Sequence, residues 1–267
     1  MKDNRLKLEI KIDGAKRLFM WHFLNKKLDL ILLSEFPKSG GSWFGQLLSE
    51  TLNIPFPRNI SPKFERCILH GHHLYHSNFN KVVTVLRDGR DTMVSSYYHF
   101  LFENDKNPNY AVKEWRKQLQ FKDYDDIKTN LPVFIQFMFE KYKSTFKRTT
   151  WSSFVNSYVD NPYAIVVRYE DLLISPVSEL IRVIGFLGYP SQDQNKIKLI
   201  VEKYSFSNQT KRKQGEENRN SFLRKGIAGD WKNHFSLEAC LTFDKYAGKE
   251  LIKAGYEKNH DWIKNYK

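Results

Sequence analysis

Four short apolar segments occur along the chain, each flanked by polar or turn-forming residues. Their sequences are LDLILLSEF at 28–36, CILHGH at 67–72, KVVTVL at 81–86 and YAIVVRY at 163–169. Short runs that are rich in β-branched residues and lack a polar face are typical of strands buried within a parallel sheet. The pattern therefore predicts four buried parallel strands.

Apolar residues with helical spacing follow the first and the last of these segments. One set comprises Trp43, Phe44, Leu47, Leu48 and Leu52, and a second comprises Leu180, Ile181, Ile184 and Leu187. Each set lies on one face of a helix, and we expect residues 236–254 to form a terminal helix. Because strands alternate with helices, we expect an α/β fold, namely a single domain with a central parallel β-sheet flanked by helices.

Residues 105–160 are rich in aromatic side chains but lack the alternation of a strand. We expect them to form helices and loops inserted between the third and fourth strands, where they shape one wall of a substrate pocket. Tyr110, Trp115, Phe121 and Tyr124 are the candidate side chains for that wall.

The length of 267 residues fits one large domain, which we expect to span residues 28–267. Residues 1–27 precede it as a segment without an assigned role. No apolar run of about 18 residues occurs, and the N-terminal sequence lacks the apolar core of a secretory signal, so we expect a cytoplasmic protein without a membrane span. The two cysteines, Cys67 and Cys240, are far apart in sequence and fit a reducing compartment.

The formal net charge of +13 predicts a positive electrostatic field that attracts anions. Nucleic acid, anionic lipid, acidic glycan and phosphorylated nucleotides all meet that description. The basic residues are mostly spread along the chain rather than gathered in a block, so we expect no nucleic-acid-binding arm.

The segment FPKSGGSWFGQLLSE, residues 36–50, joins the first strand to a helix through a glycine-containing turn. Such a turn directs free backbone N–H groups toward one point, which suits a phosphate group, and Lys38 adds a full positive charge. Gly40 and Gly45 have the spacing of the nucleoside-triphosphate P-loop, but Gln46 occupies the position of its lysine. The lysine of this chain comes early in the loop instead.

A lysine followed by a Ser-Gly-Gly-Ser run and a tryptophan resembles the loop PKSGTTW of the cytosolic-type sulfotransferases. In that family the loop receives the 5′-phosphosulfate of 3′-phosphoadenosine 5′-phosphosulfate (PAPS). The resemblance implies a P-loop-like phosphosulfate site formed by Lys38, Ser39, Gly40, Gly41, Ser42 and Trp43. Gly41 and Ser42 replace two threonines of the family. We expect these replacements to have little effect on phosphosulfate binding, because backbone donors do most of the binding there.

Two further segments resemble the family's binding site for the 3′-phosphate of the nucleotide. The segment LRDGRDTMVSSYYHF, residues 86–100, is similar to RNxxDxxVSYYHF and implies roles for Arg87 and Ser95. The segment FLRKGIAGDWKNHF, residues 222–235, is similar to RKGxxGDWKN and implies that Arg224, Lys225 and the backbone of Gly226 close over the same group. Guanidinium groups offer paired donors to phosphate, and glycine permits close approach of the backbone.

Three aromatic residues are implied to contact adenine. Tyr169 lies in RYEDLLISP, which resembles the family's YEDL segment, and Phe206 lies in YSF, where the family often has TSF. Trp43 and Phe206 would enclose the adenine ring between them, and Tyr169 would reach it. Core packing is the alternative role for each of these side chains.

Four histidines occur within LHGHHLYH, residues 69–76, where the family has a KTH segment that contains its catalytic base. The resemblance implies His72 as the base, with His73 as the alternative if the register shifts by one residue. His70 replaces the family's lysine, which helps to hold the sulfuryl oxygens. His70 and His72 would also face the same side of a strand, as metal ligands do, but the sequence offers no second ligand motif and we expect no metal.

The resemblance extends from about residue 30 to about residue 256. It implies transfer of the sulfuryl group from PAPS to a hydroxyl or amine of a small-molecule or saccharide acceptor, with release of 3′-phosphoadenosine 5′-phosphate (PAP). A P-loop small-molecule kinase and a basic glycan- or nucleic-acid-binding domain without turnover are the alternatives. The acceptor and the oligomeric state cannot be read from the sequence.

Overall fold

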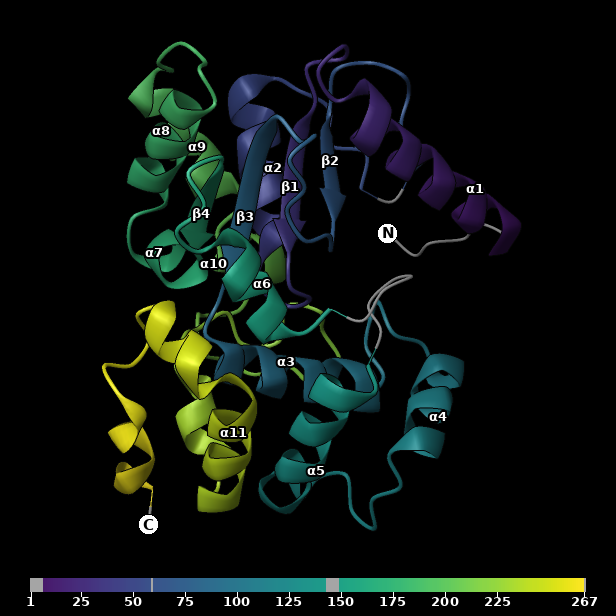
Figure 1. Ribbon diagram of the computed structural model, residues 1–267, viewed down its shortest axis with the longest axis vertical. Coiled ribbons are helices and arrows are strands. Elements are labelled where there is room, and N and C mark those ends of the chain that lie inside the picture. The colour runs from purple at the N-terminus through teal and green to yellow at the C-terminus, as the bar shows by residue number, and fades with distance from the viewer. Residues whose placement is uncertain (1–6, 59, 143–148, 267) are drawn as a thin grey trace.

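A computed structural model describes residues 7–58, 60–142 and 149–266 of the protein (Figure 1). Its four strands form one parallel sheet in the order β2-β1-β3-β4. They are β1 Ile31–Glu35, β2 Ile68–Gly71, β3 Lys81–Leu86 and β4 Ala164–Arg168. Each strand falls within one of the four apolar segments, so the prediction of a central parallel sheet is confirmed.

Helices cover both faces of this sheet, because successive side chains of each strand point to opposite faces. Ile31 and Leu33 of β1 pack in one core cluster, whereas Leu32 packs in the other. The first cluster includes side chains of α2 Gly41–Leu52, α8 Pro176–Phe186 and α9 Gln194–Lys203. The second includes side chains of α3 Gly89–Leu101, α5 Ile127–Glu140, α6 Trp151–Tyr158 and α11 Leu237–Lys253.

The remaining helices are shorter or lie at the periphery. They are α1 Lys7–Phe19, α4 Asn109–Gln118, α7 Tyr169–Ile174, α10 Phe206–Thr210, the π-helix η1 Met20–Leu24 and the 3-10 helices η2 Asp230–Asn233 and η3 His260–Asn265. In Figure 1, β3 leads directly into α3, which lies with α5 and α11 beyond the carboxyl ends of the strands. Among the described helices, none has the length and apolar character needed to cross a membrane.

The chain before residue 28 contributes directly to the core. Met20 and Trp21 of η1 are fully buried in the cluster that contains Leu32. The Trp21 ring also packs edge-on against Phe79, which follows β2, at a centroid distance of 5.6 Å. These contacts attach the N-terminal helices to the β2 edge of the sheet.

Candidate active site

A cavity of about 450 Å³ opens at the carboxyl end of the sheet. In parallel α/β sheets this edge is where ligands bind, because the chain diverges there into helices on both faces. All the predicted site residues except Ser39 and Gly41 line this cavity, namely Lys38, Gly40, Ser42, Trp43, His72, Arg87, Ser95, Tyr169, Phe206, Arg224, Lys225 and Gly226. Segments that are far apart in sequence therefore converge on one space.

The turn between β1 and α2 gives the cavity its floor. Lys38 and Gly40 both have left-handed backbone conformations, with φ of 73° and 101°. A side chain at Gly40 would also lie only 2.7 Å from the ring of Tyr169, so glycine is required there for space as well as for conformation. Ser39 is fully buried behind the turn, and Gly41 begins α2.

The ammonium group of Lys38 is positioned for an anion. It lies 3.6 Å from the centroid of the Phe222 ring, and no carboxylate of the described residues lies within ion-pair distance of it. Burial, only partly offset by the charge of Glu35, lowers the pKa of Lys38 to about 7. A bound anion would stabilise the protonated form of this lysine.

Arg87 is held from several sides at the end of β3. Its guanidinium donates to the backbone carbonyl of Ile227 at 2.9 Å, pairs with Asp91 at 3.3 Å and lies 4.4 Å from the centroid of the Tyr169 ring. Its buried Nε has no hydrogen-bond partner among the described residues. Ser95 lies two helical turns further along α3 and lines the same cavity, so the two residues are placed together as the sequence predicts.

The cations of the loop before η2 already have carboxylate partners. Arg224 forms ion pairs with Glu217 and Asp230, and the Lys225 ammonium lies 2.7 Å from Asp230. Although burial raises the pKa of Asp230, its contact with His234 at 3.3 Å and its bonds from these two cations bring the pKa far below its usual value. A phosphate group bound here would therefore share Arg224 and Lys225 with Asp230.

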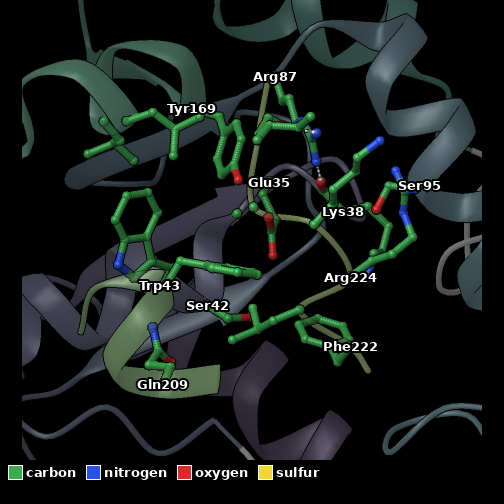
Figure 2. A pocket seen from close by; sticks show the side chains of 18 of the residues that line it. Glu35, Lys38, Ser42, Trp43, Arg87, Ser95, Tyr169, Gln209, Phe222 and Arg224 are labelled. Atoms are coloured by element: carbon green, nitrogen blue, oxygen red, sulfur yellow. Dashed lines mark hydrogen bonds between the residues drawn. The ribbon is translucent and has the colours of Figure 1, made fainter. Parts of the chain in front are cut away.

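The predicted adenine contacts come from three different elements. Trp43 and Tyr169 face each other edge-on with ring centroids 6.1 Å apart. The Phe206 ring, at the start of α10, packs so closely on Gly226 that a side chain there would lie 2.3 Å from it. In Figure 2, Trp43 and Tyr169 lie on the opposite side of the cavity from Ser95.

His72 has a defined tautomer in this structure. Its Nδ1 lies 2.8 Å from the backbone carbonyl of Glu35, and since a carbonyl only accepts, Nδ1 carries the proton. Nε2 is left with its lone pair, and the side chain lines the cavity. Burial, followed by the charge of His70, lowers the pKa of His72 to about 4. His73 does not line the cavity, and its ring packs against Trp21 at a centroid distance of 4.8 Å.

Glu35 is a cavity residue that the sequence analysis missed. Its side chain is 5% exposed, and its carboxylate accepts from His70 Nε2 at 2.8 Å and from the Gly41 N–H at 2.6 Å. Burial raises the pKa of Glu35, but the hydrogen bond from His70 and the charges of His70 and His72 outweigh it and bring the pKa to about 2. Its position, as an acidic residue at the end of an otherwise apolar strand, could have identified it from the sequence.

Three more cavity residues were missed, because the resemblance assigns no role to His99 or Phe222 within the two quoted segments and Arg58 lies outside both. Arg58, His99 and Phe222 line the cavity close to Lys38. The Nδ1 of His99 is buried without a hydrogen-bond partner among the described residues, and burial together with the charge of Lys38 lowers the pKa of His99 to about 3. These groups surround the end of the cavity that lies beside the β1–α2 turn.

The four aromatic residues expected in a substrate wall do not line the cavity. Tyr110 is 73% exposed, and Trp115 stacks on Phe100 with ring centroids 4.2 Å apart, outside the cavity. Phe121 and Tyr124 likewise pack away from the cavity, in the core around Tyr97. The cavity is instead lined by the aromatic rings of Phe100, Tyr142 and Phe222.

Known proteins with related sequences are sulfotransferases. A family model described as the sulfotransferase domain matches residues 68–255. Sulfotransferase 6B1 of Danio rerio is 25% identical over 268 residues, which cover 85% of this chain and 82% of that protein. Sulfotransferase 2A6 of Rattus norvegicus is 27% identical over 263 residues, which cover 84% of each.

Solved structures share the fold. The crystal structure of mouse sulfotransferase SULT7A1 complexed with PAP has a TM-score of 0.65 and 16% sequence identity, over 96% of this chain and 94% of that one. Retinol dehydratase in a complex with retinol and PAP has a TM-score of 0.58 and 15% identity, over 90% and 86% of the two chains. Because the family model extends over most of the chain, the resemblance is confirmed and this protein belongs to the sulfotransferase domain family.

Proposed function

We propose that the protein transfers the sulfuryl group of PAPS to a hydroxyl or amine of an acceptor, with His72 as the base. The observation that carries this proposal is the convergence of the predicted nucleotide-binding segments on one cavity at the carboxyl end of the sheet. Family membership and the PAP bound in two solved proteins of the same fold support it.

We assign each part of the nucleotide to the cavity residues whose charge or aromatic character matches it. The 3′-phosphate lies with Arg87, Ser95, Arg224 and Lys225, where permanently charged donors are concentrated. The adenine ring lies among Trp43, Tyr169 and Phe206, and the phosphosulfate lies on residues 38–42. At the start of α2 the Gly41 N–H is bonded to Glu35 and the Trp43 N–H to the Gly40 carbonyl, so we assign the Ser42 N–H to that anion.

His72 then accepts the proton of the acceptor group on Nε2. The acceptor oxygen or nitrogen forms a bond to sulfur as the bond between sulfur and the bridging phosphate oxygen breaks. Lys38 and the N–H groups of the turn stabilise the negative charge that develops on the departing phosphate. The low pKa of His72 keeps the ring neutral at pH 7, so it is ready to accept a proton without first losing one.

The acceptor occupies the part of the cavity near Phe100, Tyr142 and Phe222. Aromatic rings can stack on a small aromatic acceptor or support the face of a sugar. Arg58 and His99 add hydrogen-bond donors or acceptors at the same end. We assign a small-molecule or saccharide acceptor on this basis.

Nucleotide binding separates this proposal from its alternatives. We expect PAP to stabilise the protein against thermal unfolding, by about 2.7 kcal/mol at a concentration 100 times its Kd, and ATP with Mg²⁺ to have a much smaller effect. The measurement is a thermal shift and calorimetric titration with PAP, ATP·Mg²⁺, a heparin-like oligosaccharide and an oligonucleotide. Stabilisation by ATP·Mg²⁺ alone would favour a kinase, and stabilisation by the polyanions alone would favour a binding domain.

The pH dependence of kcat/KM for PAPS should reflect the two shifted groups, since this ratio reports the free enzyme. Lys38 acts as the cation, so kcat/KM should fall as the pH rises above about 7, its lowered pKa. His72 acts as the neutral base, so kcat/KM should fall as the pH drops toward about 4. In Lys38→Arg the alkaline decline should move to higher pH, and a decline that stays in place would contradict this assignment.

A further inference from the structure

We propose that Glu35, His70 and His72 form a binding site for Zn²⁺ or a chemically similar divalent ion. Metal binding there would switch off sulfuryl transfer, and this second part rests on the function proposed above. The sequence offered only the His70 and His72 pair. The parallel pairing of β1 with β2 brings a carboxylate beside them as a third ligand.

The three donor groups are close enough to share one ion. One ligand atom from each of Glu35, His70 and His72 lies within 4.8 Å of the other two. Two imidazoles and one carboxylate are a common ligand set for zinc, with the metal about 2.0–2.2 Å from each donor atom. An ion at their centre would need only small side-chain movements, which would draw the most distant donor inward and open the 2.8 Å contact between His70 and Glu35.

The outer contacts of His72 and Glu35 resemble those of a metal site. Ligating histidines usually donate their second ring N–H to a carbonyl or carboxylate, which fixes the ring and the tautomer. His72 does so from Nδ1 to the Glu35 carbonyl, which leaves Nε2 as the available ligand atom. The Gly41 N–H holds one carboxylate oxygen of Glu35 and leaves the other toward His70.

Burial and access both suit a bound ion. The side chains of Glu35 and His70 are only 5% and 8% exposed, so a metal ion bound between them would compete little with water for these donors. Glu35 and His72 also line the cavity, which leaves a fourth position open to a water molecule or acceptor group. The charge of Arg58, and that of Lys38 when it is protonated, lies near the site and opposes the ion. The two nitrogen ligands favour Zn²⁺ over Mg²⁺ or Ca²⁺.

Metal binding and base catalysis exclude each other. The lone pair on His72 Nε2 can be donated either to a metal ion or to the proton of the acceptor. Saturating Zn²⁺ should therefore inhibit transfer, whereas PAP should still bind because the 3′-phosphate and adenine contacts lie on other elements. Addition of a chelator should restore transfer.

Cobalt titration tests the site without relying on activity. The metal-free protein is titrated with Co²⁺. The visible absorption of this ion becomes much stronger when a protein site of four or five ligands replaces its six waters. We expect a saturable spectrum for the wild type and for His76→Ala, an exposed histidine in the same segment. Glu35→Gln and His70→Ala should bind at least about 100-fold more weakly, since loss of an outer-shell partner alone typically costs about 10–100-fold. PAP titration of each variant checks that it is folded.

The outcomes distinguish the two proposals. A wild-type protein that gives no such spectrum, or variants that bind Co²⁺ as tightly as the wild type, would overturn the metal site. Transfer that continues unchanged with Zn²⁺ at saturation would overturn the switch. If Co²⁺ binds as expected but the protein neither binds PAP nor transfers sulfuryl groups, the metal site is supported and the function proposed above fails alone.

Discussion

Replacing His72 by alanine is expected to lower kcat for sulfuryl transfer by about 10²–10⁴-fold, the usual contribution of a positioned general base. The affinity for PAP should change little, because His72 lies on the extension of β2 whereas the contacts proposed for the 3′-phosphate and adenine come from the β3–α3 junction, α2, α3, α7, α10 and the loop before η2. Turnover of labelled PAPS measures the first quantity, and calorimetric titration with PAP measures the second.

His73→Ala is the matched control for this experiment. The His73 ring packs against Trp21, outside the cavity. We therefore expect the variant to lose some stability but to keep a kcat near that of the wild type. A larger loss of kcat in His73→Ala than in His72→Ala would show that the family's histidine aligns one residue later. Equal losses in the two variants would indicate a structural effect on the whole segment.

Lys38→Met should lower kcat by about 10²–10³-fold, the effect typical of removing one group that stabilises a developing oxyanion. Methionine keeps an apolar stem that can still pack on Phe222, so the substitution removes mainly the charge. Steady-state kinetics with PAPS as the varied substrate gives kcat and KM separately.

Lys225→Met serves as the comparison, because Lys225 also lines the cavity but is paired with Asp230. We assign Lys225 to the bound nucleotide rather than to the reaction centre, so its loss should raise KM for PAPS with a smaller effect on kcat. If Lys38→Met mainly raised KM and Lys225→Met mainly lowered kcat, the roles assigned to the two lysines would have to be exchanged.

The sheet and its order of elements were predictable because the strands are local features of the sequence. Each strand lies in a short apolar run, and helical segments follow the first, third and fourth strands, which leaves few topologies for a buried parallel sheet. The helix at residues 237–253 followed in the same way from its spacing of apolar residues. In contrast, the burial of Met20 and Trp21 depends on packing against the sheet, which no local pattern in the first 27 residues reveals.

The site was predictable only where it follows continuous motifs. Lys38, Arg87 and Arg224 each lie in a run that resembles the family, and the structure brings all three to one cavity. Glu35 has no such run, because its contact with His70 arises from the pairing of β1 and β2. The carboxylate partner of Lys225 was missed for a different reason, since Asp230 lies in the motif but was not recognised as a competitor for the phosphate.

Aromatic composition alone did not identify the rings that line the cavity. Trp115 and Phe121 lie in the segment that was expected to form it, but they turn toward the helical core around α3. Composition states how many aromatic rings a segment carries, not the direction in which each one points. Among the described residues of that segment, Tyr142 is the one that lines the cavity.

A crystal structure of the protein with PAP bound tests the central claim most directly. We predict the 3′-phosphate within hydrogen-bond distance of Arg87, Ser95 and Arg224, and the 5′-phosphate on the turn that contains Lys38, with His72 Nε2 facing the position that the sulfuryl group would take. PAP bound elsewhere on the protein, with Lys38 still on Phe222 and Arg224 unchanged in its contacts with Asp230, would contradict the account.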